Sequence, residues 1–353
     1  MSVSDFIQRA SGRWLREDGP ESDVVISSRV RIARNLEDRA FPMVAAEEDQ
    51  QRLLTEVTSA AQADEVRKLG EFHMLPMRDL TPVTRQVLVE KHLISPTLLE
   101  SRVGAVLLRM DEELSVMVNE EDHLRMQCLL PGYQPVEAFH QADRLDDAFE
   151  QTLNFAFDEQ KGYLTACPTN VGTGMRASVM MHLPVLVMTG QINRILSAVG
   201  HVGLAVRGIY GEGSDALGNL FQISNQITLG QSEQEILHNL NAVALQIIDH
   251  ERNARQHLMR EAREKVEDRV CRSFGILAYA RQIDSREAME RLSDVRLGID
   301  LDIIKGVSAS IIKELMVATQ PAFLQMFFGQ EMNPQERDGK RAAMIRDRLR
   351  QDT

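Results

Sequence analysis

Five arginines stand at turns and strand ends scattered along the sequence, and their side chains suit the binding of phosphate groups. They are Arg29, Arg31, Arg125, Arg176 and Arg207. Arg29 and Arg31 are two residues apart at the end of an apolar β-type run, so both are expected on one face of a strand. Guanidinium forks match phosphate oxygens two at a time. The set predicts a cage around a polyphosphate, although each arginine alone is typical of a surface residue or a salt-bridge partner.

Four carboxylates and one cysteine are candidates for chemistry on a cationic substrate. Glu120, Glu121 and Asp122 are adjacent, so at most one or two of them can face one site. Glu212 lies between two glycines after a β-type run, and Cys167 opens the stretch CPTNVGTGMR. A solvent-exposed turn for Glu212 and a buried small hydrophobe for Cys167 are the structural alternatives.

The composition is that of a soluble globular protein with enough length for two domains. The 353 residues are 43% hydrophobic and 26% charged, and the net charge of −12 disfavours charge-driven binding to nucleic acids or membrane surfaces. No apolar run reaches the roughly 18–20 residues of a membrane span, and the first residues lack a secretory signal pattern. Cys128, Cys167 and Cys271 are odd in number and widely spaced. This argues against a disulfide framework or a zinc site and favours a reducing cytosol.

The elements that would position these residues differ between the two parts of the chain. Up to about residue 230, patterned apolar runs predict strands at 23–30, 104–110, 113–119, 203–211 and 220–230. They alternate with helical stretches in no strict βαβ order, which favours an α+β fold over a doubly wound sheet.

From Ser232 onward the sequence is helical, with an apolar stripe at helical spacing over 236–248. Capping residues predict three helix starts, at Ser232 with Glu235, at Asp284 with Glu287, and at Asn333-Pro334 with Glu336.

Four motifs occur together in a fixed order: SSRVR (27–31), NEEDHLR (119–125), CPTNVGTGMR (167–176) and RGIYGEGSDALGNLFQISN (207–225). Together they resemble the phosphagen (guanidino) kinases, such as creatine and arginine kinase, over roughly residues 20–250. The resemblance implies an antiparallel sheet flanked by helices, as in guanidino kinases and glutamine synthetase. It also implies reversible transfer of the ATP γ-phosphoryl group to a guanidinium nitrogen.

Two departures from that family refine the resemblance. Phosphagen kinases have a helical N-terminal domain that helps to enclose a small substrate, whereas SSRVR begins here at residue 27. They also end soon after the core, whereas this chain adds a helical segment containing RDGKRA (337–342). The missing lid leaves the guanidinium site open to something larger than a free amino acid. The combination resembles the bacterial protein-arginine kinases, which phosphorylate arginine side chains of proteins.

The resemblance implies two domains, a catalytic domain at 1–255 and a helical C-terminal domain at 256–353 for dimerisation and phosphoarginine binding. The boundary is soft, because a long helix can cross it. Carried over position by position, the resemblance also implies an ATP site formed by Ser27, Ser28, Arg29, Val30, Arg31, Arg125, Arg176, Ala177, Ser178, Val179, Met180, Arg207, Gly208, Ile209, Tyr210, Gly211 and Glu212.

His92, in EKHLISP, resembles the family's nucleotide-contacting histidine, with a surface histidine as the alternative. Magnesium is expected between the phosphates, held mainly by phosphate oxygens and water, so no cluster of protein metal ligands is expected.

Glu121 and Glu212 are implied to grip the substrate guanidinium and to remove a proton as the N–P bond forms. Cys167 is implied to orient the same cation as a thiolate, and Gly172 and Gly174 to let the backbone approach the ligand. A glutamate at position 212 is typical of arginine kinases rather than creatine kinases, but Tyr210 departs from the arginine kinase pattern.

Arg337, Asp338 and Arg341 are implied to form a phosphoarginine receptor, with an exposed basic helix turn as the alternative. The implied partners are protein substrates with accessible arginines, including a heat-shock transcriptional repressor, a Clp-type chaperone or protease, a zinc-binding activator, and a second copy in a homodimer. Two other functions remain open. One is a free-guanidino phosphagen kinase, and the other is a catalytically inactive adaptor that binds phosphoarginine.

Overall fold

The centre of the molecule is an eight-stranded sheet in which every neighbouring pair of strands is antiparallel. The computed structural model describes residues 12–16, 18–208 and 216–352. In spatial order the strands are β2 (Phe72–Pro76), β3 (Ala105–Arg109), β4 (Leu114–Val118), β5 (Leu124–Pro131), β1 (Val25–Arg34), β8 (Met175–His182), β10 (Leu220–Asn225) and β9 (Leu204–Gly208). A separate hairpin pairs β6 (Phe157–Asp158) with β7 (Gly162–Tyr163).

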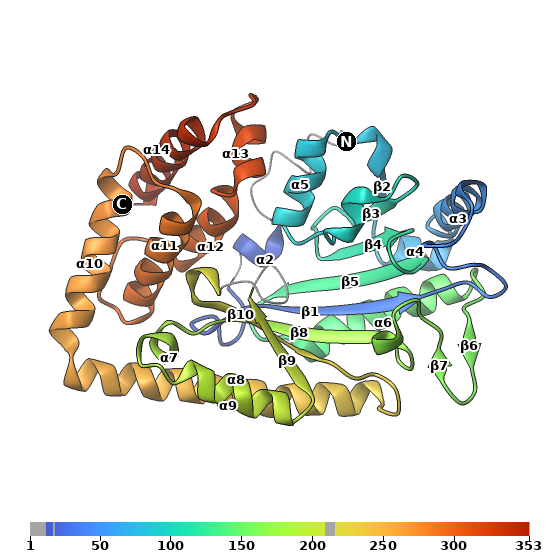
Figure 1. The fold of residues 1–353 in the computed structure, drawn as a ribbon, viewed down its shortest axis with the longest axis horizontal. Helices are drawn as coiled ribbons and strands as arrows, with labels where there is room; N and C mark the ends of the chain where they lie inside the picture. The colour runs from blue at the N-terminus through green and yellow to red at the C-terminus, as the bar shows by residue number, and fades with distance from the viewer. Residues whose placement is uncertain (1–11, 17, 209–215, 353) are drawn as a thin grey trace.

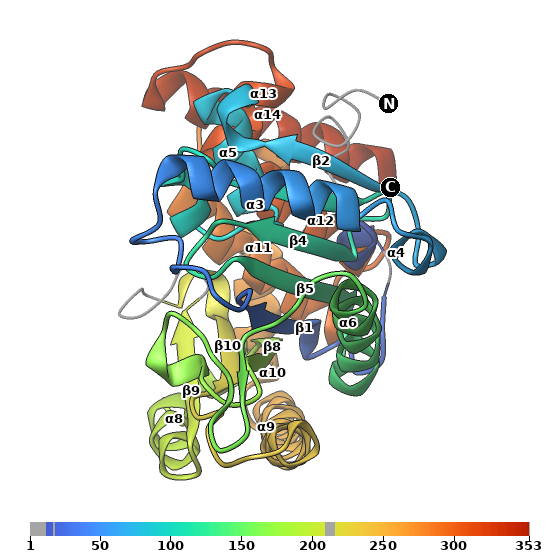
Figure 2. The same ribbon diagram turned by 90° about the vertical axis from the view of Figure 1, so that its right-hand side faces the viewer.

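One face of the sheet is covered by α6 (Pro135–Glu150) and α9 (Glu233–Glu261), which lie along the strands in Figures 1 and 2. Alternate strand residues point into this layer, and Val30, Ile32 and Ala177 are among its fully or almost fully buried members. Because side chains alternate along a strand, the residues between them point to the opposite face. The α+β fold expected from the sequence is therefore confirmed.

The C-terminal helices gather at one end of the sheet, opposite the end that carries α3 and the β6–β7 hairpin (Figure 1). No helix in the described ranges is both long and apolar enough to cross a membrane. The remaining helices are α2 (Arg13–Arg16), α3 (Glu47–Ala60), α4 (Asp64–Lys68), α5 (Pro82–Glu90), α7 (Pro184–Met188), α8 (Ile192–His201), α10 (Arg263–Tyr279), α11 (Ser285–Asp300), α12 (Ala309–Ala318), α13 (Pro321–Phe327) and α14 (Pro334–Asp352).

Each strand expected from the sequence corresponds to a strand of the sheet, although residues 209–211 of the one expected at 203–211 lie outside the described residues. The strand expected over 220–230 leaves the sheet after Asn225. β5 and β8, the two strands that flank β1, were not expected from the sequence. Both are buried on both faces over most of their length, so their sequences lack the alternation that marks a half-exposed strand.

The three helix starts expected from capping residues are confirmed. Ser232 and Glu235 form a reciprocal capping box at α9, and Asp284 accepts a hydrogen bond from the Glu287 backbone N–H. Asn333 and Glu336 cap α14 in the same reciprocal way. Helix α9 continues past residue 255 to Glu261, so the proposed domain boundary falls within a continuous helix.

A buried carboxylate joins the catalytic part to the C-terminal helices. Glu90, at the end of α5, accepts hydrogen bonds from the Ala322 and Phe323 backbone N–H groups at 3.0 and 2.8 Å, at the start of α13. Burial raises the pKa of Glu90 from 4.5 to about 7, against the opposing effect of those N–H groups and of Arg341. The ionised form of Glu90 therefore costs free energy in the folded protein.

We expect Glu90 to make the fold less stable as the pH rises. The folded state holds its proton more tightly than the unfolded state, so its contribution falls between about pH 4.5 and pH 7, by up to about 3 kcal/mol. Glu90→Gln should gain stability relative to the unmodified protein over this range, in urea unfolding at pH 5 to 8. The exposed Glu100→Gln is the control. A pH-independent difference for Glu90→Gln would contradict the expectation.

Candidate active site

The strand register places all five candidate arginines on one face of the sheet. Arg31 lies opposite Arg176, and Arg125 lies opposite Ala33, two residues along the strand from Arg31. Arg207 lies opposite Gln222, which lies opposite Met180 of the strand that carries Arg176. Directly opposed residues share a face, as do alternate residues of one strand. The cage expected from the sequence therefore has a structural basis in the neighbouring strands β5, β1, β8 and β10 and in the edge strand β9.

The same alternation turns other predicted ATP-site side chains away from the arginines. Val30, Ala177 and Val179 are fully buried in the core beneath α6 and α9. Ser28 is also fully buried, donating a hydrogen bond to the Gly132 carbonyl and accepting one from the Gln134 N–H. These four positions can reach a ligand on the arginine face only through their backbone. Ser27, Ser178 and Met180 are on the arginine face.

The arginine face concentrates positive charge away from water. Burial, together with Arg125 and Arg176, lowers the pKa of Arg29 to about 10. Burial and the same neighbours, with Arg29 added, lower the pKa of Arg31 well below its usual range, and the buried Arg31 Nε has no hydrogen-bond partner among residues 12–16, 18–208 and 216–352. Arg29 donates a hydrogen bond to the Gln222 side-chain oxygen at 2.6 Å. An anion bound here would relieve this repulsion.

The turn between β4 and β5 gives its three acids different roles. Glu120 is buried and pairs with the Arg125 guanidinium at 2.6 and 2.7 Å, and it also accepts a hydrogen bond from Ser95. Despite burial, these partners lower the pKa of Glu120. Asp122 is buried and structural, because it accepts hydrogen bonds from the Asn35 amide and the Ala166 backbone N–H, both at 2.7 Å. Glu121 remains half-buried, with no ion pair or hydrogen bond within the described residues.

Cys167 and Glu121 are both close to Arg176. Burial, then Arg207 and Arg125, lowers the pKa of Arg176, while Cys167 and Glu121 act in the opposite direction. Cys167 is half-buried, and its Sγ lies 3.1 Å from the Thr169 hydroxyl oxygen. The sequence hypotheses for Glu121, Cys167 and Arg176 therefore converge on one end of the arginine face.

The glycines of this loop have a different explanation from the one expected. Gly172 has φ +112°, and a Cβ there would lie 2.6 Å from the Thr228 carbonyl oxygen. Gly174 has φ +65°, and its Cβ would lie 2.6 Å from the Ala33 carbonyl oxygen. Both positions require glycine because the loop packs against the protein's own backbone. Close approach to a ligand is not needed to account for them.

His92 lies at the other end of the arginine face. It lines a small pocket with Ser27, Arg29 and Gln222 among others, and its ring stacks obliquely on Trp14 at 5.8 Å. Burial and Arg29 lower the pKa of His92 to about 3, so the ring is neutral. His92 and Met180 also line an adjoining, largely apolar pocket. His92 is therefore half-buried within these pockets rather than fully exposed.

Part of the predicted site lies outside the described residues: Ile209, Tyr210, Gly211 and Glu212. Gly208 ends β9 opposite Phe221. Within the described ranges, no group of three or more His, Cys, Asp or Glu residues could hold a metal ion. The donors on the arginine face are suited to phosphate oxygens rather than to a cation.

The C-terminal motif is less exposed than its sequence suggested. Arg341 is 2% exposed, and its guanidinium donates to the Thr319 and Ile283 carbonyls at 2.8 and 2.9 Å. It also pairs with Asp338 at 2.6 Å. Arg337 and Asp338 are half-buried on the same helix, so the alternative of an exposed basic turn is wrong. Arg341 connects α14 to its neighbours.

Gln222 and Asn35 also shape the site, although neither was expected from the sequence. Gln222 is the hydrogen-bond partner of Arg29, and its alternate position in the strand LFQISN was the available signal. Asn35 holds both Asp122 and, through its Oδ1, the His123 backbone N–H at 2.9 Å. No sequence pattern marked Asn35, because its partners are far away in the chain.

We expect the arginine face to lower the stability of the ligand-free protein. Arg31→Met should raise the melting temperature by about 1–2 °C, the equivalent of about 1 kcal/mol in a chain of 353 residues. It should also remove most of the stabilisation given by ATP with Mg2+, which for the unmodified protein is about 2.7 kcal/mol at a hundred times the dissociation constant.

Arg34→Met is the matched control for differential scanning fluorimetry. Arg34 points to the opposite face, where it pairs with buried Asp146 at 2.5 Å. Its replacement should lower the melting temperature and retain the shift caused by ATP. If both variants melt lower than the unmodified protein and both retain the shift, the arginine face is not an anion site.

Comparisons with known proteins agree with the four-motif resemblance. Residues 53–254 match the family model described as ATP:guanido phosphotransferase, C-terminal catalytic domain, and residues 263–353 match the model of the protein-arginine kinase C-terminal domain. The chain is 56% identical over 351 residues to the protein-arginine kinase of Brevibacillus brevis, covering 99% of this chain and 98% of that protein. It is 54% identical over 349 residues to that of Bacillus subtilis, covering 99% and 96%.

Solved structures of phosphagen kinases share the fold. Lombricine kinase matches with a TM-score of 0.58 and 23% identity, over 71% of this chain and 70% of that one. The duplicated taurocyamine kinase of Schistosoma mansoni, with bound transition-state analogue components, matches with a TM-score of 0.60 and 23% identity, over 71% and 38%. With catalytic and C-terminal family models both matched and relatives identical at more than half of their positions, the chain belongs to the protein-arginine kinases, a branch of the ATP:guanido phosphotransferases.

Proposed function

We propose that this protein transfers the γ-phosphoryl group of ATP to arginine side chains of proteins. The observation that carries the proposal is the arginine face of the sheet, with Glu121 and Cys167 at one end beside Arg176. An anionic phosphate and a cationic guanidinium would meet where these two groups of residues adjoin. Relatives at 54–56% identity that carry the name protein-arginine kinase support this choice of acceptor.

The nucleotide would extend from the arginines toward His92. Neutral His92 and Met180 line both the small pocket at Arg29 and the adjoining apolar pocket, which suits a base and ribose. The phosphates would then lie over Arg29, Arg31 and Arg176, where guanidinium forks replace the missing counter-charge. Magnesium would be held mainly by the phosphate oxygens and water, and it would offset charge on the transferring group.

The chain's own residues supply positioning and a proton acceptor. A guanidinium is delocalised and protonated, hence a poor nucleophile. Glu121 has no competing partner within the described residues, so its carboxylate is available to fix one guanidinium nitrogen in line with the γ-phosphorus and to accept a proton. Glu212 would grip the guanidinium from a second side, and Cys167 would orient it. Such positioning supplies about 7–11 kcal/mol in favourable cases.

The guanidinium end of the site is placed well for a protein substrate. Helix α2 packs against β5 and α12, at the nucleotide end of the sheet, where Trp14 contacts His92. The turn 119–123 and the Cys167 loop lie beyond the opposite ends of their strands, away from the C-terminal helices. An arginine presented on a protein surface could approach there.

One experiment separates this function from its rivals. The protein is incubated with ATP, Mg2+, free arginine and a casein-like protein, and acid-labile phosphate is then measured on each acceptor. Phosphate on the protein supports the proposal, and phosphate on free arginine alone supports a phosphagen kinase. Binding of phosphoarginine without any transfer supports an inactive adaptor.

The cellular setting follows from the family rather than from the geometry. We propose a cytoplasmic stress-response enzyme whose substrates include a heat-shock transcriptional repressor. The modified proteins would be passed to a Clp-type protease, and a zinc-binding protein would activate the enzyme. The C-terminal helices, roughly residues 256–353, would mediate a homodimer.

Glu121→Gln and Glu212→Gln should each lower kcat by at least a hundredfold, because each removes a carboxylate that holds the guanidinium and one of them removes the proton acceptor. Initial rates of phosphate transfer to a single-arginine peptide measure the effect. Glu331→Gln, which changes an exposed acid in the C-terminal part, is the control and should keep the full rate. Near-normal turnover in either variant would remove that residue from catalysis.

The phosphoarginine receptor is proposed at Arg337 and Asp338. Arg337 donates to the Met332 carbonyl at 2.9 Å through one guanidinium nitrogen, which leaves donors for a phosphate. Asp338 is about one-third exposed on its side chain and could accept from the ligand guanidinium while it pairs with Arg341. Arg341 would orient Asp338 from the buried side.

Arg337→Ala and Asp338→Ala should each weaken the binding of free phosphoarginine at least tenfold in calorimetry, as expected for loss of a charge-assisted hydrogen bond. Arg350→Ala, an exposed change on the same helix, is the matched control. Unchanged binding in both test variants would place the receptor elsewhere. Arg341→Ala is unsuited to this test, because Arg341 also holds two backbone carbonyls.

A further inference from the structure

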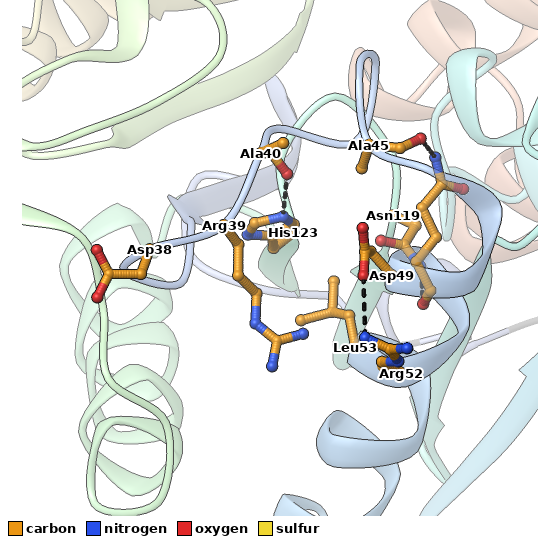
Figure 3. A pocket seen from close by; sticks show the side chains of 10 residues that line it. Asp38, Arg39, Ala40, Ala45, Asp49, Arg52, Leu53, Asn119 and His123 are labelled. Carbon is orange, nitrogen blue, oxygen red and sulfur yellow. Dashed lines mark hydrogen bonds and ion pairs between the residues drawn. The ribbon is translucent and has the colours of Figure 1, made fainter.

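A cavity of about 290 Å3 lies beside the turn that carries Glu121 (Figure 3). Its walls come from the loop after β1, from the first half of α3, and from Asn119 and His123 of the turn. None of these residues belongs to the arginine face. The cavity is therefore distinct from the nucleotide site but adjoins the guanidinium end of it.

The turn 119–123 that carries Glu121 (the catalytic turn) forms one wall of the cavity. Hydrogen bonds fix this wall in place. The Asn119 backbone N–H donates to the His123 carbonyl at 3.1 Å and closes the turn around Glu121. His123 Nδ1 accepts from the Leu36 N–H at 2.9 Å, and its Nε2 lies 3.0 Å from the Ala40 carbonyl oxygen. The loop after β1 and the catalytic turn thus hold each other in place.

Hydrogen-bond acceptors are in excess in this cavity. Asn119 is 2% exposed, and its amide nitrogen donates to the Gln50 and Val103 carbonyls. Its Oδ1 is buried and has no hydrogen-bond partner in the part of the chain that the structure describes. Asp49 lines the same cavity and pairs at 3.4 Å with Arg52, whose side chain is 70% exposed. The buried Asn119 Oδ1 therefore costs free energy until a ligand donates a hydrogen bond to it.

The basic side chains of the cavity do not balance these acceptors. Arg39 is paired with Glu56 at 2.6 Å, so its charge is already compensated. Arg52 is held only by longer contacts to Asp49 and Glu48, of 3.4 and 3.9 Å, and can turn to solvent at little cost. What remains for a ligand is a carboxylate, an amide oxygen and an apolar floor at Leu53.

The rim of the cavity is suited to a protein segment rather than to a small ion. Met43 and Val44, in the loop that forms one wall, are each 77% exposed. The first turn of α3 carries Glu47, Glu48 and Asp49 and no basic residue. An extended chain with apolar and basic side chains would complement both features.

We propose that this cavity binds a lysine or arginine side chain that flanks the target arginine in a protein substrate, with Asp49 as its ion-pair partner. The proposal rests on the proposed function. Asn119 and His123 lie two residues on either side of Glu121, and an extended chain advances about 3.3 Å per residue. A substrate residue two or three positions from the target arginine could therefore reach the cavity.

The test uses the full-length protein and peptides with one arginine, which differ only in carrying lysine, glutamine or glutamate two and three positions from it. The unmodified protein should prefer the lysine peptides over the glutamine peptides by about threefold to fivefold in kcat/KM, the range for an exposed ion pair. Asp49→Asn should abolish this preference, and Asp49→Lys should shift it to the glutamate peptides. Turnover of the glutamine peptides should change little.

Asp64→Asn is the matched control, because Asp64 is an exposed acid in the first turn of α4. It should keep the lysine preference, and the melting temperatures of the two Asn variants show whether either fold is disturbed. A lysine preference that is absent from the unmodified protein, or that survives in both Asp49 variants, overturns the subsite. Absence of transfer to every peptide by the unmodified protein would instead overturn the proposed function itself, and the subsite with it.

Discussion

The structure depends on holding five arginine side chains on one face of a sheet, although like charges repel. The antiparallel ladder fixes the backbone of Arg29 and Arg31 from both sides, through β5 and β8. The opposite face supplies the compensating stability, because Val30, Ile32, Ala177 and Val179 are buried beneath α6 and α9. A loop could not keep these guanidinium groups together without a bound anion, whereas a sheet with a buried reverse face can.

The turn that carries Glu121 and the loop that carries Cys167 are held in place by buried polar groups. Asp122 ties the turn 119–123 to the Cys167 loop, and Asn35 ties both to the end of β1. Arg34 lies over the Tyr163 ring and bonds to the Thr173 carbonyl, which holds the other side of the same loop. Each of these bonds joins segments far apart in sequence, so the geometry around Glu121 arises only when the whole sheet has formed.

The sequence was sufficient where a pattern is local or where a side chain directly serves chemistry. Helix caps such as Ser232 with Glu235 were predictable because both partners are three residues apart. The shared face of Arg29 and Arg31 followed from strand periodicity. Long-range packing was not predictable: Gly172 and Gly174 serve contacts with Thr228 and Ala33, and β5 and β8 hide their periodicity because both faces are buried. The sequence motif that contains Ala177 and Val179 also did not indicate that these two side chains point into the core.

The C-terminal helices pack against the sheet and help to form the pocket beside His92. They line the apolar pocket beside His92 through Met289, Lys313 and Met316. Glu90, two residues before His92, is bonded to the first turn of α13, and Arg341 holds the Thr319 carbonyl just before that helix. Buried hydrogen bonds therefore connect α14, through Thr319 and the start of α13, to the end of α5 beside His92. Loss of one partner in this chain of bonds would leave a buried polar group unpaired, which costs free energy.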